Sequence, residues 1–254
     1  MSILQTTPPD SVAGGRSASA DLPPEDALRT GMRMSMDEFE RRSTLAEQRG
    51  SLERHEMIEG VVYVMPPSDN KYHASPGLRL GTLVGLYRLL TVGVDAGDAG
   101  GFRAASSWVG PDYWLKIGSA DSKQTDLIGE AAAMAELCVE VSNSSLAYDL
   151  TKKRDLYQKH GVREYLVYDV RGGAILVFVR DEATGRLEQV DLDDGVFCSG
   201  VFPGLHLNLQ AVVDGDGMAA HQTLMAAIDT DEHRAFVASL AEAGRQKESA
   251  EEST

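Results

Sequence analysis

Cysteine is nearly absent from the sequence. The two cysteines, Cys138 and Cys198, are too few for a disulfide framework, and neither lies in a metal-ligand spacing such as C-x-x-C. Free cysteine is among the residues most often found in protein cores, where it behaves as a small apolar side chain. We therefore expect both cysteines to be buried.

Long apolar runs are also missing. No stretch approaches the roughly 18 apolar residues that a membrane helix needs, and the first residues lack the apolar segment of a signal peptide. With 254 residues and 43% hydrophobic content, the chain can nevertheless bury a full core. The sequence therefore predicts a cytoplasmic protein without a membrane partner, built from one folded domain with tails.

A surplus of basic residues is absent too. The formal net charge is −15 at pH 7. Broad, sequence-independent binding to nucleic acid needs a basic surface, because the phosphate backbone dominates such binding. The charge balance therefore argues against sequence-independent binding to nucleic acid. A narrow basic cleft is still compatible with this net charge.

The composition changes at both ends of the chain. Residues 1–30 are rich in Pro, Ser, Ala, Gly and Asp and contain hardly any large apolar residue, which predicts a disordered tail. The last residues, 244–254, read as a charged tail. The folded domain is accordingly expected over residues 31–243.

Helices and strands are both predicted in the first half of the domain. Ser35 opens a capping box of the form S-x-x-E and starts a helix. Residues 54–65 read as two strands around a tight turn, and the Gly- and Asp-rich residues 93–101 read as a turn region. Between them, residues 73–90 have apolar side chains at helical spacing, with three glycines four residues apart that predict a close-packed face: Gly77, Gly81 and Gly85.

Residues 137–169 contain ionisable side chains in an otherwise apolar setting. Residues 137–142 alternate as a strand with Glu140 in its middle, where an unpaired carboxylate would be costly. Residues 148–161 follow as a helix that carries Asp149, Lys153 and Tyr157 on one face. A second apolar strand comes next, so the segment is a βαβ-like unit in which Lys153 can lean over Glu140.

The remaining residues complete an α/β fold. An antiparallel meander is predicted over residues 164–198, followed by a last strand or loop over 201–213. Two closing helices are expected over residues 218–227 and 231–243. The predicted fold class is thus a mixed sheet flanked by helices, with an antiparallel C-terminal meander.

Acidic side chains at strand ends suggest hydrolysis of a phosphodiester. Such a reaction needs charge neutralisation on the phosphate and an activated water, and a divalent metal supplies both. Mg²⁺ keeps several waters and takes only one or two protein carboxylates, and a nearby lysine stabilises developing charge. Asp112 lies directly after Pro111 and before an apolar strand. Together with Glu140 and Lys153, it supplies the carboxylates and the lysine that such a site needs.

The order of these residues resembles a known nuclease core. Pro111-Asp112 before a strand and Glu140 on the next strand resemble the PD-(D/E)XK nucleases. The whole order over residues 35–240 is similar to that of the Uma-type family of restriction endonucleases, with these motifs: E-x-I-E-G from Glu56, His73, P-D, V-E-V-S, D-x-x-x-K-x-x-x-Y from Asp149, and G-V-x-E-Y from Gly161.

The resemblance implies a restriction-endonuclease-like fold and a metal-dependent endonuclease. Asp112, Glu140 and Glu56 are implied as metal ligands for Mg²⁺, with Mn²⁺ as an alternative. The ordinary motif has its lysine at position 142, which is Ser142 here, and Lys153 on the following helix is the matching residue. The implied partner is nucleic acid, DNA in the first place, and a homodimer is compatible with cutting two strands.

Three alternatives stay open at this point. Asp126 is a second acid before apolar residues, but Asp112 has the proline and the better strand after it. The fold could also serve a non-catalytic binding or regulatory protein, since a fold does not fix a function. Finally, Glu140 and Lys153 could form a buried ion pair without any metal.

Overall fold

A computed structural model describes residues 25–67, 74–98, 101–118 and 135–251 of the chain. Its centre is a six-stranded mixed sheet in the order β10-β9-β8-β7-β6-β3. β7 and β8 are parallel, and the neighbouring pairs along the rest of this sheet are antiparallel. The strands are β3 (Val94–Asp98), β6 (Tyr113–Ile117), β7 (Leu137–Ser142), β8 (Glu164–Asp169), β9 (Ala174–Arg180) and β10 (Leu187–Val190). The predicted mixed sheet is therefore confirmed.

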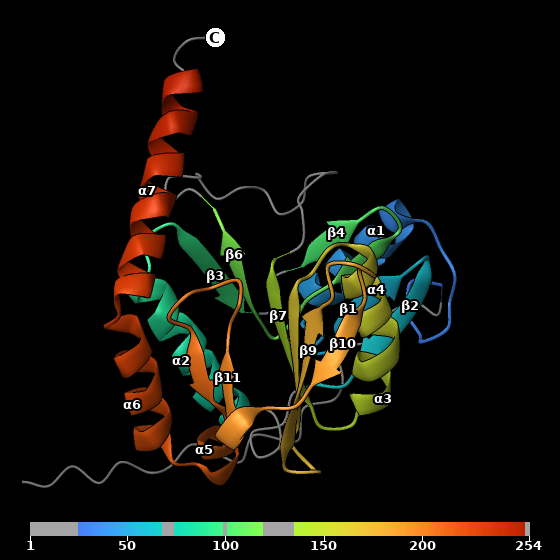
Figure 1. Ribbon diagram of the computed structural model, residues 1–254. Helices are drawn as coiled ribbons and strands as arrows, with labels where there is room; N and C mark the ends of the chain where they lie inside the picture. Colours follow the sequence, from blue (N-terminus) through green and yellow to red (C-terminus); the bar gives the residue numbers. More distant parts are fainter. Residues whose placement is uncertain (1–24, 68–73, 99–100, 119–134, 252–254) are drawn as a thin grey trace, which may run out of the picture.

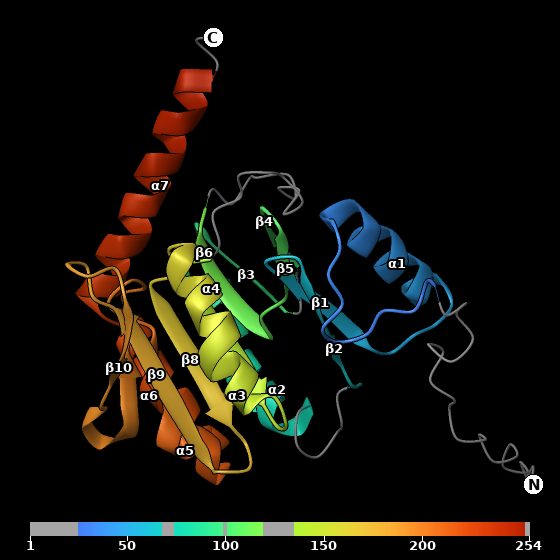
Figure 2. The same ribbon diagram turned by 90° about the vertical axis from the view of Figure 1, so that its right-hand side faces the viewer.

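A smaller antiparallel sheet in the order β2-β1-β5-β4 lies beside the main sheet (Figure 2). It contains β1 (Arg54–Ile58), β2 (Val61–Met65), β4 (Phe102–Ala104) and β5 (Ser107–Val109), and it packs against helix α1 (Met36–Gln48). Ser35 caps α1 by accepting a hydrogen bond from the Glu38 amide, as the capping box predicts. Leu28 is buried in the same cluster, so packed residues begin before position 30, inside the predicted tail.

The two faces of the main sheet have different coverings. Helices α2 (Ser75–Leu90), α5 (Leu209–Asp214) and α6 (Gly217–Ile228) lie on one face, and a helical segment after β7 lies on the other (Figures 1 and 2). Side chains of β7 alternate between the faces: Leu137 and Val139 join the core under α2, whereas Cys138 joins the core under the other helix. Glu140 therefore projects away from α2.

The helix after β7 has a wide turn in its middle. It begins as α3 (Leu146–Tyr148), continues as a π-helical turn, η3 (Asp149–Lys153), and ends as α4 (Arg154–Lys159). The sequence predicts one helix over this region, and the structure confirms it apart from the π turn. Such turns occur often at functional sites because they change which side chains face inward.

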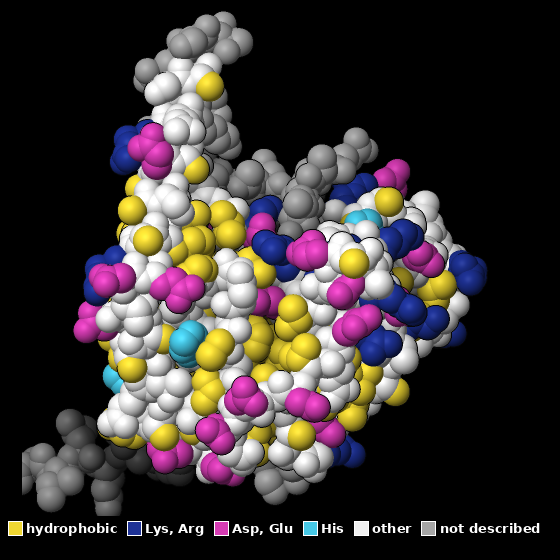
Figure 3. Space-filling model, viewed as in Figure 1, with side chains coloured by type: hydrophobic (Ala, Val, Ile, Leu, Met, Phe, Trp, Pro, Cys, Tyr) yellow, Lys and Arg dark blue, Asp and Glu magenta, His cyan; other side chains and the backbone are white. Residues whose placement is uncertain are grey.

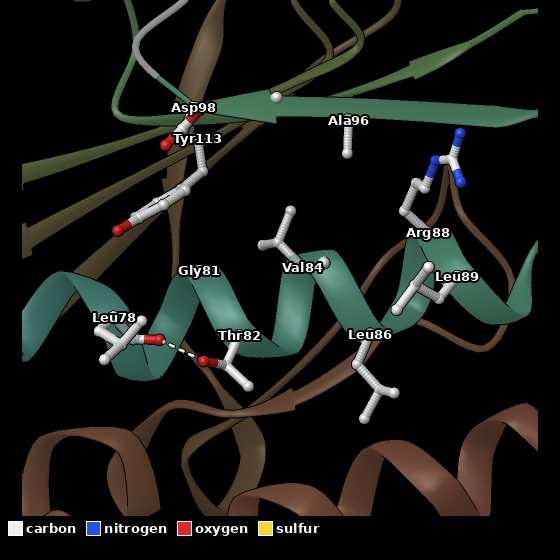
Figure 4. Close-up of a pocket in the computed structure, with 12 residues that line it drawn as sticks. Leu78, Gly81, Thr82, Val84, Leu86, Arg88, Leu89, Ala96, Asp98 and Tyr113 are labelled. Atoms are coloured by element: carbon white, nitrogen blue, oxygen red, sulfur yellow. Dashed lines mark hydrogen bonds between the residues drawn. The ribbon is translucent and has the colours of Figure 1, made fainter.

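Helix α2 packs on the sheet through two of the three glycines that were predicted to form a close-packed face. A methyl group at Gly81 would overlap the ring of Tyr113, and one at Gly77 would lie 3.0 Å from the Tyr113 hydroxyl. Gly85, in contrast, faces open space. Between α2 and the edge strand β3 lies a mainly apolar groove of about 640 Å³, lined by Leu78, Leu86, Leu89, Ala96, Tyr113 and neighbouring residues (Figure 4).

Several predicted elements differ from the observed ones. Residues 93–101 were expected to be a turn region, but β3 occupies Val94–Asp98 and pairs with β6 along its whole length. This position of β3 is a glycine, Gly97, because the Trp114 ring of β6 lies against it and leaves no room for a side chain. Tertiary packing thus overrides the weak strand propensity of Gly and Asp.

The C-terminal half also departs from the prediction. The meander holds for β8, β9 and β10, but β11 (Val196–Cys198) leaves the main sheet and pairs with β12 (His206–Asn208). Short helical turns also occur here, η4 (Asp193–Gly195) before β11 and α5 after β12. Asn208 starts α5 by capping the Ala211 amide, so residues 201–213 are not a single strand or loop.

The C-terminal helix α7 (Asp231–Glu251) is longer than predicted and rises from the body of the protein (Figure 1). It includes residues up to 251 that were assigned to a charged tail. Cys138 is buried as expected, but Cys198 is exposed because it lies on the two-stranded ribbon outside the main sheet. Among the described helices, none is long and apolar enough to cross a membrane.

Candidate active site

Glu140 is fully buried on the central strand β7 and binds two donors. Its Oε1 atom accepts hydrogen bonds from Lys153 Nζ at 2.8 Å and from the Tyr157 hydroxyl at 2.7 Å. Both donors come from the helix after β7, where they lie four residues apart on one face. The predicted pairing of this strand with this helix face is therefore observed.

Lys153 joins Glu140 to a second carboxylate, Glu56 of β1. The Lys153 Nζ atom lies 2.9 Å from Glu56 Oε1, and the side chains of Glu56, Glu140 and Lys153 are only 2–3% exposed. The Tyr148 hydroxyl donates to Glu56 Oε2 at 2.9 Å, and the Gly110 amide donates to Oε1. The two sheets thus meet at one buried lysine, which brings three of the four predicted residues into direct contact.

Asp149 anchors the start of the π turn. Its Oδ2 atom accepts hydrogen bonds from the Ser142 hydroxyl at 2.5 Å and from the Ser145 hydroxyl at 2.6 Å. Ser142 stands at the end of β7, so these bonds tie the helix to the strand that carries Glu140. The role of Asp149 is therefore to hold the helix in the register that directs Lys153 inward.

Asp112 lies beside this group, in the loop between β5 and β6. Its Oδ2 atom accepts a hydrogen bond from the Val141 amide at 2.7 Å, next to Glu140 on β7. Its Oδ1 atom accepts from Arg54 Nη1 at 2.6 Å. Asp112 is 5% exposed and is close enough to affect the charge states of Glu140 and Lys153.

Arg54 and Tyr148 were not predicted to belong to the site. Arg54 precedes Glu56 by two residues on β1, and strand alternation places both on the same face. That spacing is a signal the sequence does contain, but the partner of Arg54 is Asp112, 58 residues away. Tyr148 reaches Glu56 across 92 residues, and its ring packs on Tyr63 at a centroid distance of 4.6 Å. Neither contact could be inferred from local spacing.

The electrostatics of the site are dominated by burial. Burial raises the pKa of Glu140 well above its usual value, and the carboxylates of Asp112, Asp149 and Glu56 add to the rise, whereas Lys153 opposes it. For Lys153, burial alone would lower the pKa, but Glu140 and Glu56 raise it above the ordinary lysine value. Lys153 therefore stays charged, and Glu140 depends on a nearby cation to remain ionised.

The site has more acidic than basic groups. Four carboxylates are buried in it (Glu56, Asp112, Glu140 and Asp149), and two cations, Arg54 and Lys153, face them. With all four ionised, the site would carry two more negative than positive charges, and burial raises the pKa of Glu140 and of Asp149 accordingly. A divalent cation would favour the ionised form of these carboxylates. Carboxylate oxygens are also the ligands that Mg²⁺ and Mn²⁺ prefer.

The observed side-chain positions favour ion pairing over metal coordination. Among the described residues, no three His, Cys, Asp or Glu side chains are gathered closely enough to hold a metal ion. The carboxylates that would act as ligands instead face Lys153 and Arg54. The donor types therefore fit a hard divalent metal, provided that at least one of these ion pairs opens.

Two residues considered in the sequence lie outside the described parts of the chain, His73 and Asp126. The apolar groove at α2 is on the opposite face of the main sheet from the carboxylates. On the face shown in Figure 3, most Lys and Arg side chains lie on the right-hand half together with Asp and Glu side chains, and the lower part carries mostly Asp and Glu. The described residues of that face therefore do not form a continuous basic surface.

Comparisons with known proteins place the chain in a family. A search of the curated proteins found no match. Among solved structures, one described as "a putative nuclease belonging to DUF820" from Anabaena variabilis aligns with a TM-score of 0.49 and 17% identity over 63% of this chain and 90% of that one. The family described as "Uma2: Putative restriction endonuclease" matches residues 36–210, well over half of the chain. The chain therefore belongs to the Uma2 family.

Proposed function

We propose that the protein is a metal-dependent endonuclease that hydrolyses phosphodiester bonds in DNA. The observation that carries the proposal is the buried Lys153 held between Glu56 and Glu140, beside Asp112. A structural ion pair needs one acid for each base, whereas this site buries an excess of acids. The family membership supports a nuclease in general, and the donor set supports a divalent metal.

Asp112, Glu140 and Glu56 are the residues that would hold Mg²⁺ or Mn²⁺. When bound, such a metal neutralises charge on the phosphate and lowers the pKa of a water. Lys153 is placed to stabilise negative charge that develops on the phosphate oxygens, because it stays protonated in its buried position. Tyr157 and Tyr148 fix Glu140 and Glu56 through their hydroxyl groups, which keeps both carboxylates in defined orientations.

Cleavage of a covalently closed plasmid in the presence of Mg²⁺, Mn²⁺ or EDTA tests this function. We expect nicking or linearisation with either metal and none with EDTA. Lys153→Met should abolish cleavage, with a loss of at least about a hundredfold, as is usual when a charge-stabilising group is removed. The matched control is Lys159→Met, which removes an exposed lysine of the same helix and should cleave at the wild-type rate.

Two other results would reject the proposal. Saturable metal binding without cleavage of DNA or RNA would indicate a non-catalytic protein with a nuclease fold. Cleavage that survives in Lys153→Met would show that the activity does not arise at this site.

We also propose that the protein acts as a homodimer in the cytoplasm. Cutting both strands of a duplex benefits from two sites related by a two-fold axis. Sedimentation equilibrium of the full chain tests this point, since a dimer has twice the 27.4 kDa mass of the chain. A monomer at all concentrations, with and without duplex DNA, would contradict it.

A further inference from the structure

Arg54 is the most accessible charged residue of the site. Its side chain is 33% exposed, whereas the side chains of Asp112, Glu56 and Lys153 are at most 5% exposed. It lies at the start of β1, two residues before Glu56 and on the same face. Arg54 is therefore the positive group of the site that a large ligand meets first.

Lys153 is poorly suited to hold a substrate phosphate by itself. Its ammonium group already contacts Glu56 at 2.9 Å and Glu140 at 2.8 Å, deep in the protein. Glu56 and Glu140 thus already neutralise the charge of Lys153. A second cation is needed to bind the phosphate before reaction. Arg54 is the other cation of the site among the described residues, and the carboxylate that it contacts is Asp112.

The guanidinium group of Arg54 has more N–H donors than the one that binds Asp112. Among the described residues, it donates one hydrogen bond to a side chain, from Nη1 to Asp112 Oδ1. Arginine has five N–H donors in a planar fork, an arrangement that matches two phosphate oxygens at once. The same Oδ1 atom of Asp112 belongs to a carboxylate that we propose as a metal ligand. Arg54 and the proposed metal therefore compete for the same oxygen of Asp112.

We infer that Arg54 binds the phosphate of the nucleic acid and exchanges its ion pair with Asp112 for that phosphate, which removes a cation that competes with the metal for Asp112. The inference rests on the proposed function and adds to it a substrate contact. Phosphate and metal then bind in a coupled manner, since the phosphate removes the competitor of the metal. No covalent bond changes in this exchange.

The inference predicts opposite effects of one substitution on two ligands. Arg54→Gln removes the phosphate contact, so the affinity for a fluorescein-labelled DNA duplex in EDTA should fall at least about fivefold. The slope of log K against log salt should become shallower by about 0.9, the value for one lost phosphate contact on duplex DNA. The affinity for Mn²⁺ without DNA, measured by calorimetry, should instead rise several-fold because Asp112 has lost its competing cation.

Arg163→Gln is the matched control. Arg163 is a surface arginine paired with Glu182 at 3.3 Å, outside the site, and its replacement should change neither affinity. If Arg54→Gln does not fold, Arg54→Lys serves in its place. It keeps a charge beside Asp112 but lacks the planar fork, so it should bind the duplex more weakly than the wild type.

The possible outcomes separate the inference from the proposed function. Equal duplex affinity in the wild type and the Arg54 variant, or no duplex binding by the wild type in EDTA, would overturn the inference. A fall in both duplex and Mn²⁺ affinity would also overturn it, because it would indicate a merely structural role. A wild type that neither binds Mn²⁺ nor cleaves DNA would instead refute the proposed function.

Discussion

At the scale of single residues, the site contains buried charged side chains that need partners of opposite charge. Glu140 and Glu56 lie at 1–2% exposure, and Lys153 is the cation that contacts both. An intact buried ion pair contributes little to stability, but the removal of one partner leaves an uncompensated charge. The lysine is therefore essential for folding stability as well as for the proposed chemistry.

Lys153→Met should lower the free energy of unfolding by about 3–5 kcal/mol at neutral pH. Without the lysine, the pKa of Glu140 rises further above its ordinary value of 4.5, so the folded state holds a proton that the unfolded state releases. The stability of the variant should therefore fall relative to the wild type as pH rises above that value. Urea unfolding at a series of pH values measures this difference.

Adding Glu140→Gln to Lys153→Met should recover part of the loss, because it removes one of the buried charges. Lys159→Met, whose lysine is 60% exposed, should change stability by no more than about 0.5 kcal/mol. A pH-independent loss in Lys153→Met would contradict the electrostatic explanation and indicate lost packing instead.

The residues of the site were predictable to different degrees. Glu140 and Lys153 could be predicted because an acid within an apolar strand and a lysine on the next helix are local patterns. Arg54 could not be predicted, because its partner Asp112 is 58 residues away, in the loop between β5 and β6. Likewise, no local pattern indicates that Asp112 accepts a hydrogen bond from the Val141 amide of β7.

At the scale of helices and strands, two structural features determine how the helices pack on the main sheet. The π turn from Asp149 to Lys153 directs both of these side chains into the protein. On the other face of the sheet, α2 approaches Tyr113 of β6 through glycine. The glycine spacing was visible in the sequence, whereas the strand β3 beside it was hidden by its Gly and Asp content.

Gly81→Ala and Gly85→Ala should have opposite effects on stability. At Gly81 the new methyl group overlaps the Tyr113 ring, and overpacking of this kind costs about 1–3 kcal/mol. At Gly85 the space is open, so the better helix propensity of alanine should stabilise the protein by up to about 1 kcal/mol. Thermal or urea unfolding of the two variants measures the contrast, and equal effects would contradict the packing described for α2.

Glu164 joins strand β8 to the loop before β12. It accepts hydrogen bonds from the Ser199 hydroxyl at 2.6 Å and the Gly200 amide at 2.8 Å, and burial raises its pKa above 4.5 although these bonds oppose the rise. Glu164→Ala should cost about 1–3 kcal/mol because the buried donors lose their acceptor. Glu164→Gln keeps an acceptor without the charge.

The two Glu164 variants should respond differently to pH. Because the folded-state pKa is raised, the wild type loses stability as pH rises from 4.5 towards that pKa, and Glu164→Gln should lose less over the same range. Chemical denaturation at several pH values tests this expectation. Parallel pH profiles for wild type and Glu164→Gln would show that Glu164 is not the group that titrates.

At the scale of the whole molecule, the overall charge opposes the proposed substrate. The net charge is −15, and the face in Figure 3 carries acidic side chains throughout, also among its Lys and Arg side chains. Association with DNA therefore has to rely on a few local cations and on bound metal, and it should weaken steeply with salt. The mixed sheet was predictable from the alternation of strands and helices, and so was the hairpin of β1 and β2 that carries Glu56. The joining of this hairpin to β5 was not predictable, since Met57 pairs with Trp108 across many residues.

The central claim is that Asp112 and Glu140 are ligands of one divalent metal. A calorimetric titration of Mn²⁺ into the wild type, Asp112→Asn, Glu140→Gln and the surface control Glu188→Gln tests it most directly, once thermal unfolding shows that each variant is folded. The account predicts saturable binding in the wild type and Glu188→Gln, and its loss in both site variants. No binding in the wild type, or unchanged binding in Asp112→Asn and Glu140→Gln, would contradict it and leave the carboxylates as partners of Lys153 and Arg54.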